Sequence, residues 1–128
     1  MSEYDIQVSV VQWARLNEVN WPELRWLHHI PNGGYRGKPT VTRKGNILPP
    51  LAAQRMKAAG VKKGIPDLCL PFPRKGYHGL YLEVKANNGS VSREQKECIA
   101  FLQEQGYCVC VGKGYDQCVD ALRSYLEG

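Results

Sequence analysis

Two neighbouring apolar runs of the sequence carry charged residues whose types and spacing are suited to catalysis. The first run contains an aspartate, and the second ends in a Glu-x-Lys triplet. Asp67 lies in the run Ile65 to Leu70, and Glu83 and Lys85 close the run that begins at Leu80. Both runs are rich in branched apolar residues and are bounded by Gly and Pro, which predicts two strands. Two carboxylates and an amine held together are suited to binding a divalent cation at a phosphodiester and to assisting an attacking water.

The segment between the two runs sets how these side chains meet. Pro71 to Gly79 contains two prolines and two glycines in nine residues, which predicts a hairpin loop. If the loop is symmetric about Lys75, antiparallel pairing places Asp67 opposite Glu83, with Cβ atoms about 4.5–5.5 Å apart. Side chains alternate along a strand, so Lys85 shares the face of Glu83. Facing carboxylates repel each other, so we expect a divalent cation between them, toward one edge of the sheet.

The expected cation is Mg²⁺ or Mn²⁺. Such an ion takes hard oxygen ligands, commonly one or two carboxylates with water and substrate phosphate completing its shell. Asp67, Glu83 and the backbone carbonyl of Val84 are the candidate ligands, and Lys85 is the candidate catalytic amine. A second triplet, Glu94-Gln95-Lys96, fits the same Glu-x-Lys pattern but lies on a predicted helix, so this pattern alone is a weak signal.

Positive charge is concentrated in one stretch of the chain. The net charge is +5, yet the stretch between Pro31 and Pro66 has no acidic residue and eight basic ones. A local basic patch is typical of proteins that bind a phosphate backbone, although a solvated face is the alternative. The candidate DNA-binding residues are Asn32, Arg36, Lys38, Arg43, Lys44, Arg55, Lys62 and Lys63.

Periodicity and capping residues predict four helices and four strands. The predicted helices span Ser2 to Asn17, Pro50 to Ala59, Ser92 to Gln105 and Tyr115 to Leu126. The predicted strands span Leu24 to Ile30, Ile65 to Leu70, Leu80 to Val84 and Tyr107 to Val111, and a long loop is predicted from Tyr35 to Ile47. The order α-β-α-β-β-α-β-α predicts an α/β fold, a central mixed β-sheet flanked by helices, in a single domain over residues 1–128.

Composition excludes several classes of protein. The chain is 43% hydrophobic and 23% charged, as in ordinary globular domains, and no apolar run approaches the roughly 20 residues of a membrane span. The first residues are acidic and polar, unlike a signal peptide, so we expect a cytoplasmic protein. Five cysteines match no disulfide framework. Cys108-Val109-Cys110 has no second pair at zinc-ligand spacing, so these cysteines are interpreted as small packing residues.

Four segments together resemble a known family. They are Gly60 to Asp67, Tyr81 to Lys85, Ser92 to Gln95 and His28 to Gly34. The chain resembles the VRR-NUC nucleases of the PD-(D/E)XK superfamily from about Glu3 to Leu126, which implies a restriction-endonuclease-like core. The resemblance implies that the strand Asp and the Glu of Glu-x-Lys bind metal and that the Lys is catalytic, which corresponds to Asp67, Glu83 and Lys85.

The resemblance also implies two further site residues. Gln95 corresponds to the Gln of the family's active-site motif, and its alternative role is a capping box with Ser92. The superfamily often adds a metal-binding Glu from the first helix, for which Glu3 is a candidate and Gln7, one turn later, another. The alternative for Glu3 is a charge that complements the helix dipole.

Stand-alone members of this family are associated with phages and bacteria and with branched or flapped DNA. The resemblance therefore implies such a substrate, Holliday junctions included, and a phage or bacterial host cytosol. A two-fold homodimer would place two active sites on a symmetric junction. Two alternatives stay open: a non-catalytic DNA-binding module on a nuclease-like fold, and another junction resolvase of the same superfamily. His28, His29 and Asn32 suggest a His-based metal nuclease, but a structural or phosphate-contacting role is preferred for the two histidines. Asn32-Gly33-Gly34 is interpreted as a turn whose backbone amides could approach a phosphate, or simply as a tight turn.

Overall fold

The computed structural model describes residues 1–33 and 39–128 in two compact units. The sheet unit comprises residues 1–30 and 64–128, and the inserted unit comprises residues 31–63. Among the helices described, none is both long and apolar enough to cross a membrane. The candidate catalytic residues all belong to the sheet unit.

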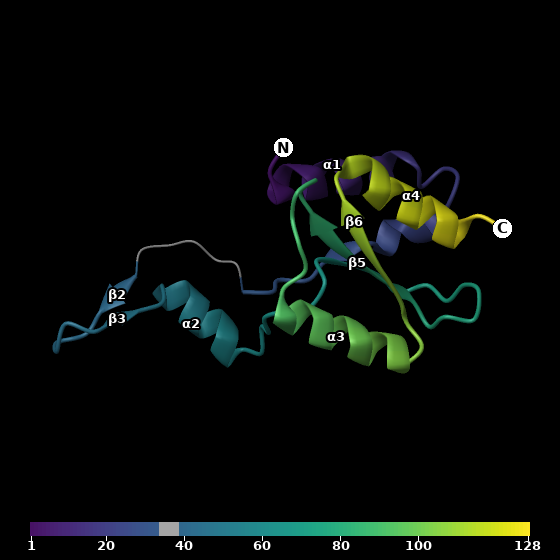
Figure 1. Cartoon of the computed structure of the whole chain (residues 1–128). Coiled ribbons are helices and arrows are strands. Elements are labelled where there is room, and N and C mark those ends of the chain that lie inside the picture. Colours follow the sequence, from purple (N-terminus) through teal and green to yellow (C-terminus); the bar gives the residue numbers. More distant parts are fainter. Residues whose placement is uncertain (34–38) are drawn as a thin grey trace. The chain divides into compact units, whose positions relative to one another are not determined.

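The sheet unit is built on a four-stranded mixed sheet (Figure 1). Its strand order is β1 (His28–His29), β4 (Leu68–Leu70), β5 (Leu80–Lys85) and β6 (Cys108–Lys113). The β1–β4 and β4–β5 pairs are antiparallel and the β5–β6 pair is parallel, which confirms the predicted mixed sheet. Because β1 and β6 flank them, β4 and β5 are central, so the expectation that their carboxylates lie toward a sheet edge is wrong.

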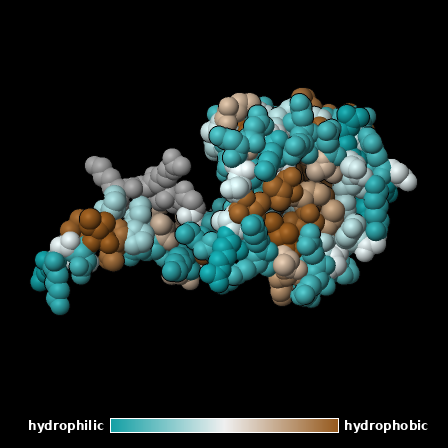
Figure 2. All heavy atoms as spheres, in the orientation of Figure 1, coloured by the Kyte–Doolittle hydropathy of each residue, from teal (hydrophilic) through white to brown (hydrophobic). Residues whose placement is uncertain are grey.

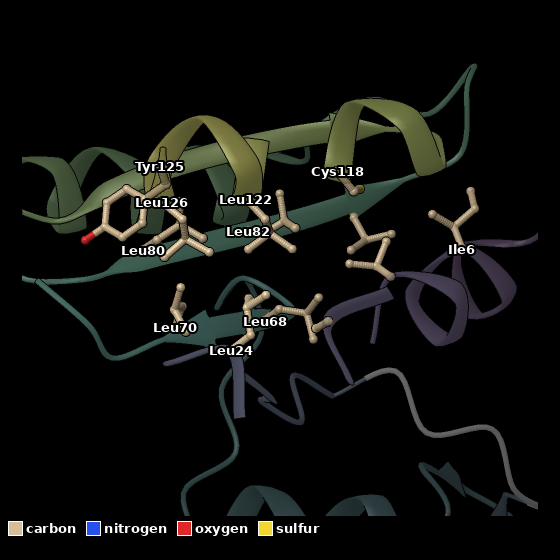
Figure 3. Packing of buried hydrophobic residues seen from close by; sticks show 13 residues of the cluster. Ile6, Leu24, Leu68, Leu70, Leu80, Leu82, Cys118, Leu122, Tyr125 and Leu126 are labelled. Carbon is tan, nitrogen blue, oxygen red and sulfur yellow. The ribbon is translucent and has the colours of Figure 1, made fainter. Parts of the chain in front are cut away.

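Helices cover both faces of this sheet (Figure 1). Helices α1 (Glu3–Leu16) and α4 (Tyr115–Leu126) lie on one face and α3 (Arg93–Glu104) on the other, close to their predicted bounds. Figure 3 shows Leu122 and Cys118 of α4 pointing toward Leu82 of β5 in the buried core. The strand residues of this core alternate with Glu83 and Lys85, so the core fixes which side chains turn to the α3 face.

Capping boxes begin two of these helices. The Ser2 hydroxyl accepts from the Asp5 N–H, and Asp5 reaches back to Ser2. Ser92 and Gln95 form the same arrangement at α3, as the sequence predicts. These caps explain why the helix bounds were predictable to within one or two residues.

The first two predicted strands are shorter in the structure, whereas β5 and β6 lie close to their predicted bounds. Pro22–Trp26 forms a 3₁₀-helix, η1, where a strand was predicted from Leu24, because Pro favours the first turn of a helix. Only His28–His29 then pairs with β4. Strand β4 begins at Leu68 and not at Ile65, because Pro66 has no N–H to donate and Gly64 has a positive φ of +90°.

The inserted unit contains a hairpin followed by a helix. Strands β2 (Thr40–Val41) and β3 (Ile47–Leu48) pair antiparallel, and α2 spans Leu51–Ala58. The α2 helix confirms the prediction for Pro50 to Ala59. The predicted loop from Tyr35 to Ile47 is wrong in its second half, because two-residue strands are too short to give an alternating pattern.

Candidate active site

The register of β4 and β5 places Asp67 opposite Glu83. The observed pairs are Leu68 with Leu82, Cys69 with Tyr81 and Leu70 with Leu80, so the next pair along the same register is Asp67 with Glu83. The turn is centred on Lys75 and Gly76, which have consecutive positive φ values of +54° and +84°. The predicted loop symmetry about Lys75 is confirmed in the strands on either side.

The Asp67 side chain, just before β4, accepts a hydrogen bond from the neighbouring strand β5. Its Oδ2 accepts a hydrogen bond from the Val84 N–H at 2.8 Å. The N–H and C=O of one strand residue point to the same side, so the Val84 carbonyl is directed to the side on which Asp67 lies. The Asp67 carbonyl in turn accepts from the Ile30 N–H at 2.8 Å and from His29 Nδ1 at 2.9 Å. Both ends of Asp67 are therefore fixed by the sheet.

Glu83 is a buried carboxyl with one unsatisfied oxygen. Its side chain is 2% exposed, and Oε1 accepts from Gln95 Nε2 at 3.2 Å. The other oxygen, Oε2, is buried and finds no hydrogen-bond donor in the described part of the chain. The pKa of Glu83 is raised to about 9, mainly by burial and then by the hydrogen bond to Asp67 and the charge of Asp67. The charge of Lys85 opposes this shift. Without a cation, Glu83 therefore holds its proton at neutral pH.

Gln95 both completes the capping box of α3 and contacts Glu83. Its Oε1 accepts from the Ser92 N–H at 2.8 Å, which completes the capping box of α3. Because the amide oxygen of Gln95 accepts this bond, its amide nitrogen faces Glu83, with Nε2 at 3.2 Å from Glu83 Oε1. The cap thus orients the Gln95 amide toward the carboxylate on the neighbouring strand.

Lys85 and Glu3 lie close to the same carboxylate. Lys85 is 7% exposed, and its Nζ lies 4.0 Å from Glu83 Oε1. Glu3 Oε2 accepts from the Ala86 N–H at 3.4 Å, just beyond the end of β5, and the Glu3 charge contributes least to the raised pKa of Glu83. The structure therefore brings together Asp67, Glu83, Lys85 and Gln95, with Glu3 at the margin of the group.

This donor set fits a hard divalent cation. Asp67 and Glu83 supply carboxylates, the orphaned Oε2 of Glu83 lacks a partner that a cation would provide, and the Val84 carbonyl faces the same side. Mg²⁺ and Mn²⁺ commonly take one or two protein carboxylates with water and substrate oxygens. Across residues 1–33 and 39–128 no three His, Cys, Asp or Glu side chains gather as metal ligands.

The histidines contact backbone carbonyls. His28 Nδ1 lies 2.9 Å from the Trp26 carbonyl, and His29 Nδ1 bonds that of Asp67. Each Nδ1 must carry the proton that it donates there, so only Nε2 of each ring is left as a possible metal ligand. Asn32, the third member of the suggested His-based site, is half-buried in the inserted unit.

All but Asn32 of the candidate DNA-binding residues with described structure are exposed. They lie in the inserted unit, and Arg43, Lys44, Arg55, Lys62 and Lys63 are all exposed. Arg36 and Lys38 lie outside the described residues. Lys57, absent from the predicted set, lines a hollow of about 1000 Å³ with Lys62 and Lys63. Helical spacing gave no signal that would have placed Lys57 beside those two lysines.

The close approach of Gly64 to the first turn of α3 was not predicted from the sequence. A Cβ at Gly64 would lie 2.7 Å from the Glu94 carbonyl oxygen, and its φ of +90° suits only glycine. Gly64 therefore allows the segment before Asp67 to approach the first turn of α3, next to Gln95. The glycine in Gly64-Ile65-Pro66-Asp67 was the available signal.

Comparison with known proteins assigns the family. The fold and the paired carboxylates with a lysine define a nuclease-type α/β domain. The family model described as the VRR-NUC domain matches residues 1–115. A solved structure titled "VRR_NUC domain protein" is similar, with a TM-score of 0.73 and 28% identity, covering 99% of this chain and 89% of that one. No curated protein matches. The chain belongs to the VRR-NUC domain family.

Proposed function

We propose that this chain is a Mg²⁺- or Mn²⁺-dependent DNA endonuclease that acts on branched or flapped DNA, Holliday junctions included, as a homodimer. Residues 1–128 act as one nuclease domain in this proposal, in a phage or bacterial cytosol. The observation that carries it is the buried carboxyl of Glu83 beside Asp67 and Lys85, with no donor to its Oε2 among the described residues. A buried carboxylate of this kind is costly unless a proton neutralises it or a cation binds it.

Each site residue has a separate task in the proposed reaction. Asp67, Glu83 and the Val84 carbonyl would hold the cation, which when bound polarises the phosphodiester and lowers the pKa of an attacking water. Gln95 holds Oε1 of Glu83, which leaves Oε2 available. The Lys85 ammonium, 4.0 Å from Glu83, orients the water or stabilises charge that builds up on the phosphate oxygens.

The inserted unit supplies affinity for the nucleic acid in this proposal. It has no acidic residue, so its basic side chains are available to neutralise phosphates. The chain leaves the sheet unit after Ile30, which bonds the Asp67 carbonyl, and returns at Gly64, which packs on Glu94. Both points of attachment within the sheet unit thus lie beside the candidate active site.

A cleavage panel tests the proposal. Purified protein is incubated with single-stranded, duplex, 5′-flap and four-way-junction DNA in Mg²⁺, Mn²⁺ or EDTA. We expect cutting of the flap or junction with either metal and none in EDTA. A folded protein that binds these DNAs but cuts none of them with either metal would instead support the non-catalytic module.

A further inference from the structure

The β2–β3 hairpin of the inserted unit has a rigid basic tip. The Thr42 N–H donates to the Asn46 carbonyl at 2.9 Å, and the Gly45 N–H donates to the Thr42 carbonyl at 3.0 Å. The Thr42 hydroxyl accepts from the Asn46 N–H at 3.0 Å. The positive φ of Gly45, +82°, closes the turn. Arg43 and Lys44 occupy the tip and are exposed.

An apolar cross-strand pair lies directly behind this tip. Val41 and Ile47 face each other across the hairpin, on one face of the ribbon. They are 68% and 75% exposed. Figure 2 shows this apolar surface over β2 and β3, with hydrophilic surface at the tip. No residue of the inserted unit belongs to the buried core found among the described residues. The pair therefore has no evident role in the packing of its own unit.

Side-chain hydrogen bonds from α2 hold the base of the β2–β3 ribbon. Gln54 of α2 donates through Nε2 to the Pro49 carbonyl at 2.6 Å and to Thr40 Oγ1 at 3.0 Å. The Thr40 hydroxyl also donates to the Pro49 carbonyl at 3.1 Å. Within the inserted unit, the ribbon is thus fixed to α2. A preorganised ribbon loses little conformational entropy when it meets a partner.

The chemistry of the surface selects a nucleic acid as that partner. A partner that covers Val41 and Ile47 would also have to neutralise Arg43 and Lys44, since the inserted unit itself has no acidic residue. A DNA duplex satisfies both demands, because its phosphates flank a major groove that is about 12 Å wide and admits a two-stranded ribbon. Apolar side chains then meet thymine methyl groups or wedge between base steps.

We infer that the β2–β3 ribbon binds a duplex arm of the substrate, with Arg43 and Lys44 on the phosphates and Val41 and Ile47 against the groove. This inference deepens the proposed function and rests on it for the identity of the substrate. It separates duplex recognition, by the ribbon, from cleavage, by Asp67, Glu83 and Lys85. It also assigns a binding role to two apolar residues that charge alone would not select.

Binding of fluorescent DNA, followed by anisotropy, tests the ribbon. The background is Lys85→Ala in Mg²⁺, so that DNA stays intact, and each Kd is measured for a 20-bp duplex and a single strand over a range of salt. Arg43→Ala/Lys44→Ala should weaken duplex binding at least about tenfold and lower the salt slope by about 2. Val41→Ser/Ile47→Ser should weaken duplex binding about fivefold with the salt slope unchanged. Single-strand binding should change less than about twofold.

Arg15→Ala/Arg123→Ala is the matched control, since it removes two exposed charges from the sheet unit. It should change duplex binding by less than about twofold. Equal losses in the control and in the tip variant would overturn the ribbon. The inference would also be overturned if the Val41→Ser/Ile47→Ser protein bound duplex normally but became monomeric. The apolar face of Val41 and Ile47 would then be the surface that docks a second copy of the chain. Circular dichroism confirms that each variant is folded.

The outcome also separates this inference from the nuclease. Wild-type protein that shows the predicted binding pattern but cuts no DNA would leave the ribbon standing and overturn the endonuclease. Protein that cuts DNA, while both ribbon variants bind and cut like wild type, would overturn the ribbon alone.

Discussion

At the scale of the residue, the protonation of Glu83 couples stability to pH. An unfolded chain releases this proton near the ordinary value of 4.5, whereas the folded protein keeps it to a pKa of about 9. The unfolded state therefore binds fewer protons across this window, and the free energy of unfolding falls as pH rises from about 4.5 to 9. We predict this fall in EDTA, measured by urea denaturation at several pH values.

Glu83→Gln provides the control for that prediction, because the amide resembles the protonated carboxyl and does not titrate. The variant should lose most of the fall in stability between pH 4.5 and 9, and it should no longer respond to Mg²⁺. Wild-type and Glu83→Gln curves that run parallel over this range would contradict the assignment of the titrating group.

Gln95 connects a helix cap to the site, and two substitutions separate its tasks. Gln95→Glu keeps an acceptor for the Ser92 N–H but removes the donor to Glu83, so stability should change by less than about 0.5 kcal/mol while kcat falls at least about tenfold. Gln95→Ala should also lose about 1 kcal/mol with the cap. Thermal melts and cleavage rates provide the two readouts. Gln95→Glu protein with wild-type kcat would show that the contact to Glu83 is dispensable.

At the scale of the element, the sequence predicted those features that neighbouring residues determine, such as helix starts and the hairpin register. The capping residues Ser2 and Ser92 marked helix starts, and the composition of the β4–β5 loop gave the register that faces Asp67 with Glu83. The central position of this pair depends on β1 and β6, whose partners are distant in sequence. The β2–β3 hairpin was missed because each strand has only two residues.

The same limit applies within the candidate site. Asp67, Glu83 and Lys85 could be selected by residue type and spacing, and the role of Gln95 could be narrowed to two. That Gln95 both caps α3 and contacts Glu83 depends on the first turn of α3 lying beside Glu83 of β5, which no local pattern encodes. The contact of His29 with Asp67 depends likewise on the β1–β4 pairing.

Gly64 fixes how closely the segment before Asp67 approaches α3. Gly64→Ala places a Cβ 2.7 Å from the Glu94 carbonyl oxygen, in addition to the strain of a positive φ. We predict a loss of about 3 kcal/mol or more by urea denaturation, with cleavage reduced because Asp67 and Gln95 shift apart. Gly76→Ala is the control: its φ is +84° but nothing lies within 4 Å, so it should cost only about 1 kcal/mol. Equal costs would mean that the close approach is unimportant.

At the scale of the whole molecule, the concentrated positive charge and the candidate active site belong to different units. The inserted unit carries eight basic and no acidic residues, whereas the remaining residues have nine basic and twelve acidic ones, a balance of −3. Affinity for DNA should therefore follow the inserted unit and fall steeply with salt, while kcat at saturating DNA should follow the sheet unit.

The proposed homodimer makes a prediction of its own. Wild-type and Lys85→Ala protein are mixed, allowed to exchange subunits, and given a supercoiled plasmid that extrudes a four-way junction. Mixed dimers have one working site each, so nicked circles should accumulate at the expense of linear product. A product ratio independent of mixing would indicate that the two cuts come from separate monomers.

The central claim is that Asp67, Glu83 and Lys85 form a metal-dependent nuclease site. The most direct test compares cleavage by wild type, Lys85→Ala and Lys96→Ala on the preferred DNA in Mg²⁺, with DNA binding measured alongside. Lys96 belongs to the second Glu-x-Lys triplet, is exposed and lies on α3, which makes it a matched control. We predict that Lys85→Ala binds DNA normally but cuts at least about a hundredfold more slowly, and that Lys96→Ala cuts like wild type. Undiminished cutting by Lys85→Ala would contradict the assigned site.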